Sequence, residues 1–357
     1  MFDNLSIYTL PAEFRLNLQD NLDNMSKLSS KPLTASQVSR LGWKAPMNDE
    51  RPYVLLEEDS LFLIERRYKS IASSTLKEAI NQQILKLAKE SPATWGPDAK
   101  VTKTQKKDLS DMVRSALIKQ AHTQFSETYV LVSHELHMVL IGSTKNSHNE
   151  DVIDLFRATF KSFPAKPLQL NNEASQSFLS WLSETGAPEL FEVQDGGLVM
   201  QSRHNSSNKV AYNSQLMNSD EISANILADK QPSKIELAWD ASLSFCLDSN
   251  MKFSKIKQMG ILKSRIKSSV ELGAGGKETG TVAEAAEKNR LKQMSKCALS
   301  RLSILAMLKK LLPAMGGFKC THRTISSAQD DKVSSMIGEF ESGESEGGTN
   351  TDGILSS

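Results

Sequence analysis

The sequence predicts an α+β fold, with mixed sheets and long helices in a multi-lobed, elongated subunit. Short apolar runs bounded by turn residues indicate strands, and longer segments repeat apolar residues at helical spacing. The two kinds of segment follow one another without the regular alternation of a doubly wound sheet. A chain of 357 residues can bury a substantial core, and we expect two or three lobes of one unit.

The strands are expected where apolar runs are short and lie between turn signals. Residues 2–10 form the first, and residues 234–239 and 243–247 form the last two. Residues 196–213 are polar and rich in turn residues, so no strand is expected there. Two hairpins are predicted between these ends, the first from Tyr53–Leu56 and 61–66, the second from 129–132 and Met138–Ile141.

The helices are expected where apolar residues recur every three or four positions. The clearest case begins at Ser74, a plausible N-cap, and continues to about residue 89. A second long helix covers Lys103–Gln120. Further helices are expected over residues 16–28, 150–160, 174–183 and 283–312, with a short one after Ser219.

The net charge of +1 conceals an uneven distribution. Residues 251–310 hold 14 lysines and arginines against four acidic residues, whereas residues 329–357 hold one lysine and seven acidic residues. The sequence therefore divides into three parts. Residues 1–250 form an α+β region of several lobes, residues 251–317 a basic, largely helical region with a Gly-rich linker at 271–281, and residues 318–357 an acidic tail expected to be disordered.

Several functional classes find no support in the sequence. Cys246, Cys297 and Cys320 lie far apart, which argues against a zinc ribbon or a disulfide scaffold. The longest apolar run, 302–312, is too short to span a bilayer and includes two lysines. No signal-like segment is recognisable, so we expect a cytoplasmic protein that does not enter a membrane.

The sequence contains no complete catalytic, metal-binding or cofactor-binding motif. His134 and His137 are three residues apart between strand-like segments, whereas a zinc-binding HExxH motif needs a spacing of four on a helix. The glycines at 273–276 before Lys277 lack the first glycine and the hydroxyl residue of a phosphate loop. We therefore expect no enzyme, no metal and no cofactor.

The helix at Lys103–Gln120 carries the most suggestive charges. Lys103, Lys107 and Arg114 fall within about 40° of one another around the helix. Leu109, Met112, Val113 and Ala116 lie roughly opposite and are expected to pack. A cationic stripe of this kind can follow phosphates, although it can equally be an ordinary solvated face.

A second basic stretch, residues 252–267, contains no acidic residue and interleaves cations with apolar side chains. DNA, an anionic surface or an acidic partner would suit it, and so would a basic amphipathic element lying on the core. The acidic tail could also compete for this patch and weaken non-specific DNA binding. The candidate DNA-binding residues here are Lys252, Lys255, Lys257, Lys263 and Arg265.

Several short landmarks follow one another in a fixed order. They read FDNLSIYTL at 2–10, LGWKAPM at 41–47, LKEAINQQILKL at 76–87, KTQKKDLSDMV at 103–113, QFSET at 124–128 and SDEISANILADKQPSKIELAWD at 219–240. In this order they resemble the recombination-associated protein RdgC family. Leu155 with Arg157, Pro164 with Pro167, and Trp181 continue the pattern. Together they cover about two-thirds of the chain.

The resemblance implies a ring-shaped homodimer that encircles double-stranded DNA without sequence preference and limits the access of RecA recombinase. Because the ring interior of the family is basic, Lys103, Lys106, Lys107 and Arg114 become candidates for DNA contact. His122 and Phe125 become candidates for the dimer interface. His122 stands where the family tends to carry an aromatic residue, which would make the contact more polar.

Two functions follow as hypotheses. The first is a non-enzymatic, sequence-independent DNA-binding protein that modulates homologous recombination, associated with the nucleoid. The alternative is a protein-interaction module that docks an acidic recombination partner through its basic C-terminal region, with DNA contact incidental.

Overall fold

The computed structural model describes residues 1–34, 37–47, 51–96, 101–182, 186–205, 207–217, 219–273 and 282–319. The strands in this part of the chain are β1 (Leu5–Thr9), β2 (Ser39–Lys44), β3 (Tyr53–Leu56), β4 (Asp59–Lys69), β5 (Thr123–Ser133), β6 (Met138–Ile141), β7 (Lys166–Pro167), β8 (Phe191–Val193), β9 (Leu198–Ser202), β10 (Lys209–Tyr212), β11 (Lys230–Trp239), β12 (Leu243–Asp248) and β13 (Lys252–Gln258). The helices are the 3₁₀ turn η1 (Gln19–Asn21) and α1 (Leu22–Lys27), α2 (Ser73–Glu90), α3 (Pro92–Trp95), α4 (Lys103–Gln120), α5 (Asn146–Phe160), α6 (Ala174–Leu182), α7 (Asp220–Leu227), α8 (Gly260–Gly273) and α9 (Val282–Ala314). The predicted α+β class is confirmed.

The strands join into one sheet in the order β10-β9-β11-β12-β13-β1-β6-β5-β4-β2, with β3, β7 and β8 attached to β4, β1 and β11. Each pairing between these named strands is antiparallel. The sheet continues from the N-terminal strands into β11–β13 through the pairing of β1 with β13. The first and last thirds of the chain therefore share one framework.

The centre of the sheet is buried on both faces, which explains its continuous apolar runs. Val130 and Val132 face a cluster that includes Trp43 and Phe156, on the side covered by α5. Leu131, between them, faces the opposite cluster, which includes α6 and α9. Successive strand residues point to opposite faces, so one short apolar run serves two cores.

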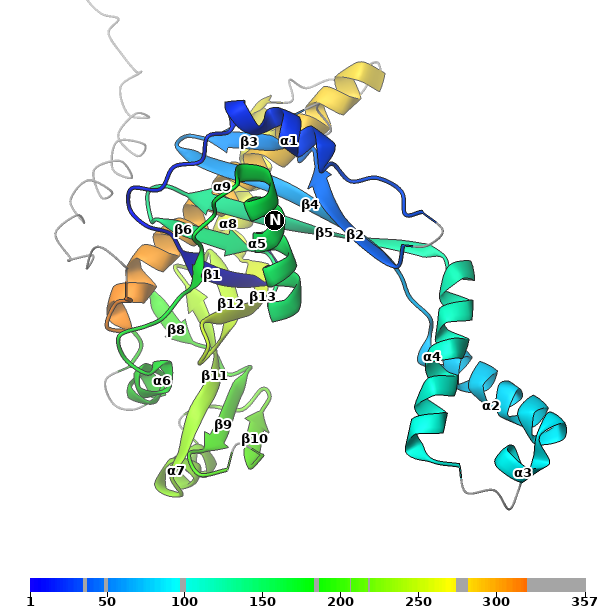
Figure 1. Ribbon diagram of the computed structural model, residues 1–357. Helices are drawn as coiled ribbons and strands as arrows, with labels where there is room; N and C mark the ends of the chain where they lie inside the picture. Colours follow the sequence, from blue (N-terminus) through cyan, green and yellow to red (C-terminus); the bar gives the residue numbers. More distant parts are fainter. Residues whose placement is uncertain are drawn as a thin grey trace, which may run out of the picture.

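The longest strands carry an arm away from this core. β4 and β5 pair from Ser60–Val132 to Lys69–Thr123. Both strands are buried near one end, and near the other end β4 is half-buried and β5 is exposed. The chain between them forms α2, α3 and α4, which stand clear of the sheet at the far end of the β4–β5 ribbon (Figure 1). We call α2–α4 the arm.

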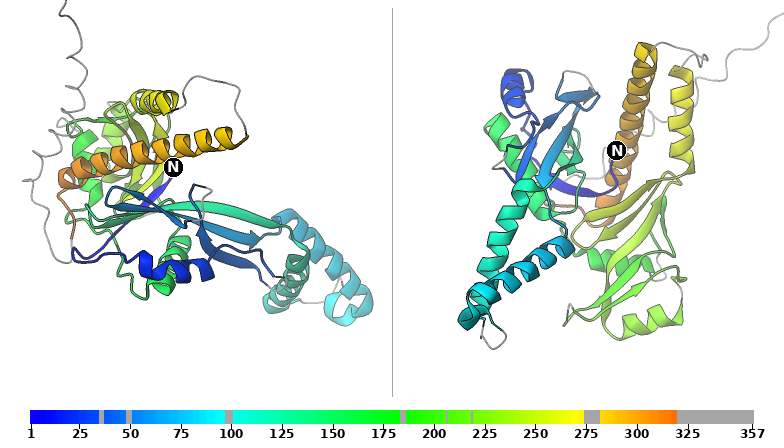
Figure 2. Two further views of the ribbon diagram at one scale, coloured as in Figure 1. Left: turned by 90° about the horizontal axis from the view of Figure 1, so that it is seen from above. Right: turned by 90° about the vertical axis from the view of Figure 1, so that its right-hand side faces the viewer.

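Two further parts project from the body. A lobe built from β9, β10, the end of β11 and α7 extends on the same side as the arm (Figure 1). Helices α8 and α9 pack against each other and extend to the opposite side, as Figure 1 and the right-hand view of Figure 2 show. We call residues 260–273 and 282–296 the α8–α9 hairpin.

The C-terminal half of α9 is part of the main core. Cys297, Leu308 and Leu312 are among its buried residues, in the same cluster as Leu5 and Phe245. Phe318 is also buried, and Lys319 N–H donates to the carbonyl of Gln169 at 2.8 Å. The helix predicted over residues 283–312 is confirmed by α9, and the packing continues through the last described residues. The rest of the predicted acidic tail and most of the predicted linker, residues 274–281, lie outside the described residues.

Local predictions were wrong in four places. Residues 196–213 contain β9 and β10, whose half-buried pattern was hidden by polar residues on the exposed face. Residues 16–28 form only η1 and the short α1. The long helix was expected to begin at Ser74, but its N-cap is Ala72. The basic stretch 252–267 is divided between β13 and α8, because the pairing of β13 with β12 holds its first half in the sheet.

Candidate nucleic-acid interface

Helix α4 has strong local reasons to form. Thr102 is its N-cap, and its hydroxyl accepts a hydrogen bond from the N–H of Gln105 at 3.2 Å. The side chain of Gln105 accepts in return from the N–H of Thr102 at 2.8 Å. This reciprocal capping box satisfies two backbone donors that the first helical turn leaves unpaired. The predicted bounds, Lys103–Gln120, are confirmed.

The arm has a thin apolar core, because two packed helices cover only one side of each other. Leu109 is buried against this core, and Val113 is half-buried beside it. Met112 and Ala116 were expected to pack with them, but Met112 is 55% exposed and Ala116 is exposed. The packing stripe is therefore narrower than predicted, and the rest of α4 faces solvent.

The predicted cations lie on the solvent side of α4. Lys103, Lys107 and Arg114 are exposed and lie about 120–160° around the helix from Leu109. Lys106 is exposed nearer the packing stripe. None of the four forms an ion pair within the described part of the chain, so their charges are available to a ligand.

A network of charges holds the root of the arm, where β4 leaves the core. The carboxylate of Glu65, 2% exposed, accepts hydrogen bonds from Ser30 Oγ at 2.5 Å, Lys44 Nζ at 2.9 Å and Arg67 Nε at 2.5 Å. Burial alone would raise the pKa of Glu65, but these three donors outweigh it and lower the pKa to about 2. Glu65 is therefore ionised at neutral pH.

Lys44 also connects this network to the predicted dimer-interface residue Phe125. Its ammonium contacts Glu127 at 2.6 Å and lies 5.7 Å from the centre of the Phe125 ring. The ring is nevertheless 65% exposed, and His122 is exposed three residues earlier on the chain. Both residues are thus accessible on the surface of the arm root.

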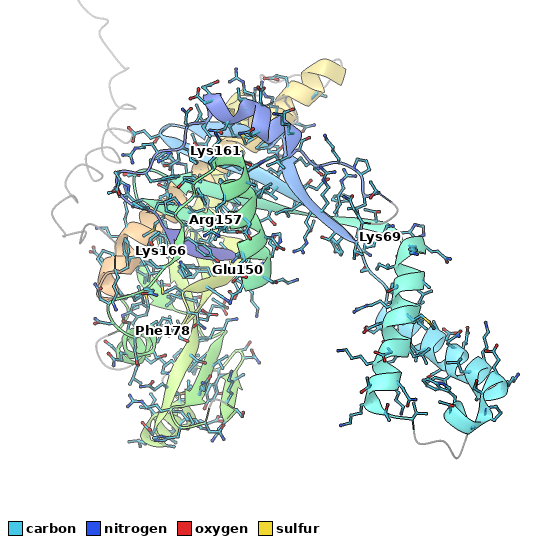
Figure 3. The ribbon with its side chains drawn as sticks, in the orientation of Figure 1. Lys69, Glu150, Arg157, Lys161, Lys166 and Phe178 are labelled. Carbon is cyan, nitrogen blue, oxygen red and sulfur yellow. The ribbon has the colours of Figure 1, made fainter. Side chains whose placement is uncertain are left out.

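One more contact ties the arm to the ribbon. Lys69, at the end of β4, donates to the carbonyl of Lys119 at 3.4 Å, near the C-terminus of α4. Figure 3 shows Lys69 at the junction of ribbon and arm, well separated from Arg157, Lys161 and Lys166 on the body.

The second predicted set of cations does not form one surface. Lys252 is half-buried beside a cavity of about 640 Å³ that Tyr8, Glu150 and Arg157 also line. Lys255 and Lys257 are exposed on β13, where Lys255 has a φ of 55° at an irregularity in the pairing with β12. A left-handed residue of this kind is typical of a β-bulge.

Lys263 and Arg265 are exposed on α8, in the α8–α9 hairpin. This hairpin and the arm extend to opposite sides of the body (Figure 2). The structure therefore places the α4 cations and the α8 cations on different sides of the body. The sequence alone did not predict this relative placement.

The α8–α9 hairpin carries a cationic row that the sequence analysis did not single out. Lys288, Lys292 and Lys296 are exposed on α9 at a spacing of four, which places them along one face over about 12 Å. The spacing itself was a readable signal, but these lysines were counted only in the overall charge of residues 251–310.

No feature of the described residues forms a metal site. Among them, no group of three or more histidine, cysteine, aspartate and glutamate side chains could hold an ion. His134 and His137 lie in the turn between β5 and β6, as expected. No helix in the described part of the chain is both long enough and apolar enough to cross a membrane.

A family model described as "Putative exonuclease, RdgC" matches residues 1–317, which is most of the chain. The chain belongs to the RdgC family. Several relatives are named recombination-associated protein RdgC. The protein from Shewanella frigidimarina (strain NCIMB 400) is 25% identical over 282 residues, covering 78% of this chain and 88% of the relative.

Two others support the same assignment. The protein from Shewanella baltica (strain OS195) is 24% identical over 320 residues, covering 89% of this chain and 98% of the relative. That from Proteus mirabilis (strain HI4320) is 24% identical over 266 residues, covering 74% and 86%. These RdgC names indicate a recombination-associated protein, and the predicted resemblance is confirmed. The RdgC match ends at residue 317, so the acidic segment lies beyond it.

Proposed function

We propose that this protein is a non-enzymatic, sequence-independent double-stranded DNA-binding protein that acts as a homodimer and modulates homologous recombination. The observation that carries the proposal is the stripe formed by Lys103, Lys107 and Arg114 on a projecting arm, exposed and without ion-pair partners in the described structure. Residues 66–127, which contain the arm, hold 12 lysines and arginines against six acidic residues. An excess of unpaired cations on one element is typical of phosphate contact.

Sequence-independent binding follows from the kind of contact available. Lysine and arginine side chains along a helix face can meet phosphates at intervals, and phosphate contacts position a protein without reading bases. The arm and the β9–β10 lobe extend on the same side of the sheet, which suits an elongated ligand lying against that side (Figure 1).

A homodimer fits the exposed apolar side chains of the arm and its root. On the arm, whose own core is thin, Leu85 is 65% exposed and Met112 is 55% exposed, and at the root Phe125 on β5 is 65% exposed. Apolar side chains on a projecting element are often covered by a second subunit. In the proposed dimer, His122 and Phe125 lie at the contact between subunits, and the two subunits together enclose the duplex as a ring.

Enclosure of the duplex would limit the access of RecA recombinase, and this is the proposed link to recombination. The protein would then work at the nucleoid. Its effect would depend on occupancy of DNA rather than on turnover, so neither a metal nor a cofactor is needed.

Topology provides the sharpest test. A closed ring loaded onto linear duplex slides off free ends, whereas it stays on a closed circle when salt weakens the phosphate contacts. We expect retention on circular DNA to exceed retention on linear DNA of the same length after a challenge with high salt. Equal retention would contradict ring closure, and strong sequence selectivity would contradict the proposed binding mode.

A separate assay addresses the family description. Linear and nicked duplexes incubated with the protein and Mg²⁺ or Mn²⁺ should remain intact. Metal-dependent release of nucleotides would replace this proposal with a nuclease function.

The alternative function keeps the basic C-terminal region as a docking site for an acidic recombination partner. It is favoured by one observation, the separation of the α8 cations from the arm. Replacing Lys263 and Arg265 with glutamine distinguishes the two functions. If DNA affinity is unchanged while inhibition of recombination is lost, the partner-docking function is the correct one.

A further inference from the structure

Four lysines of the α8–α9 hairpin form no ion pair within the described structure. Lys288, Lys292 and Lys296 form no ion pair there, and neither does Lys263 on α8. The nearest acidic residue on α9 with a described side chain, Glu287, already pairs with Arg290 at 3.4 Å. A row of uncompensated lysines on a projecting hairpin is a surface for an extended polyanion.

The hairpin also exposes apolar side chains beside these lysines. Leu291 is 43% exposed, Met294 is 37% exposed and Ile261 on α8 is 42% exposed. A ligand for this surface would therefore combine acidic groups with a few apolar ones. Phosphates alone would leave the apolar side chains uncovered.

The chain contains a segment with this chemistry. Residues 329–357 hold seven acidic residues and one lysine, and Glu339 and Glu341 flank Phe340, close to Met336 and Ile337. The segment lies beyond the part that matches the RdgC family, which ends at residue 317. The acidic segment thus lies outside the family-matched residues 1–317, whereas the basic α8–α9 hairpin lies within them.

The length of chain allows the contact. From Lys292 to the end of α9 at Ala314 the helix rises about 33 Å. Glu339 lies twenty positions after Lys319, the last described residue, and such a length of chain can span up to about 70 Å. The acidic residues can therefore reach back along α9 to the lysine row.

We propose that the acidic segment 329–357 docks on the α8–α9 hairpin of its own chain, and that DNA phosphates compete with it there. The docking holds independently of any DNA function, whereas the competition rests on the proposed function. Tethering gives the segment a millimolar effective concentration, so even weak intrinsic affinity keeps the hairpin occupied at low salt. Polyanionic DNA at sufficient concentration displaces it.

The docking is tested in the full-length protein without DNA. A carbodiimide joins carboxylates to amines in direct contact, and mass spectrometry identifies the linked peptides. We expect links between residues 329–357 and Lys288, Lys292 or Lys296 at low salt, lost at about 0.5 M salt, where the Debye length falls to a few ångströms. The links should disappear in a K288Q/K292Q/K296Q variant and remain in the matched K145Q/K161Q/K166Q variant, which removes three exposed lysines from the body.

Dilution separates docking within one chain from docking between copies. Links within a chain keep their yield as the protein is diluted, and links between copies do not. Absence of tail-to-hairpin links, or equal links to the body lysines, would contradict the proposal. Links that form only between copies would assign the hairpin to a second subunit instead.

The competition is tested with an E339Q/E341Q/E344Q/E346Q variant. If duplex DNA also contacts the hairpin lysines, and the segment occupies them for about nine-tenths of the time, the variant should bind DNA about tenfold more tightly at low salt. The gain should vanish when the three α9 lysines are also replaced. If links form but no variant binds DNA, the docking stands and the proposed function fails. An equal gain without the lysines would show that the segment acts by general repulsion, and would contradict competition at this site.

Discussion

Arg301 Nε lies 2.6 Å from Asp59 Oδ2, and this ion pair joins the C-terminal helix α9 to the start of β4. Asp59 is fully buried and Arg301 is 4% exposed. The other oxygen of Asp59 accepts from the N–H of His134 at 3.0 Å, while Arg301 also contacts Glu57 at 3.1 Å. Residues 242 positions apart thus complete each other's hydrogen bonding in the core.

Loss of one member of this pair should be severe. The R301M substitution leaves the Asp59 carboxylate buried without its main partner, and we expect the free energy of unfolding to fall by about 3–5 kcal/mol. Chemical denaturation followed by circular dichroism measures the change. Replacing both partners, as D59N/R301M, should restore part of the loss. The control is E57Q, which removes a 71% exposed side chain and should cost less than about 1 kcal/mol.

Glu65 should make the root of the arm sensitive to acid. Its pKa is about 2 in the folded protein, below its usual value of 4.5, so its ionisation stabilises the fold above pH 4.5 and this contribution is lost as the pH falls toward 2. The full shift corresponds to on the order of 3 kcal/mol. The measured effect should be smaller, because Lys44 and Arg67 are about one-third exposed and solvent screens them.

The E65Q variant isolates this contribution from other acid effects. The difference in unfolding free energy between the wild type and E65Q should be largest near pH 7 and should shrink between about pH 4.5 and 2. A difference that is constant with pH would mean that the carboxylate charge is not what stabilises the ribbon. S30A removes a neutral donor to the same carboxylate and should have a smaller effect.

The α4 stripe should control the salt dependence of DNA binding. The K103Q/K107Q/R114Q variant should reduce the slope of log K against log salt by up to about one unit for each lost contact, uniformly across DNA sequences. Titrations at several salt concentrations measure the slope. K145Q/K161Q/K166Q removes the same charge from the body and should change the slope little. If the two variants behave alike, binding reflects net charge and not the arm.

Phe125 should control assembly. We expect F125S to raise the dimer dissociation constant on the order of 10- to 30-fold, because an exposed aromatic ring at an interface is often an energetic hot spot. Mass in solution over a range of concentrations measures this. Folding should be unaffected, since the ring is already 65% exposed. The control is L227S, which removes an 88% exposed apolar side chain from α7. Unchanged assembly in F125S would place the interface elsewhere.

The local patterns of the sequence determined much of this protein. Helix α4 depends on features local to its own segment: the capping residues Thr102 and Gln105, and the helical spacing of its apolar residues. The helix and the exposure of its cations were therefore predictable from the sequence. Trp43, Trp181 and Trp239 are buried for a similar reason, because each lies among apolar neighbours in the sequence. The ordered landmarks also identified the family.

Only the tertiary structure decided where these elements lie. Strand pairing across the whole chain drew residues 252–258 into the sheet and left Lys252 beside a cavity, although residues 252–267 form one continuous basic stretch in the sequence. The same pairing sent the α4 cations and the α8–α9 lysines to opposite sides of the body. Such placement depends on contacts between residues far apart in the chain, as between Arg301 and Asp59, and the spacing of residues within a segment carries no information about them.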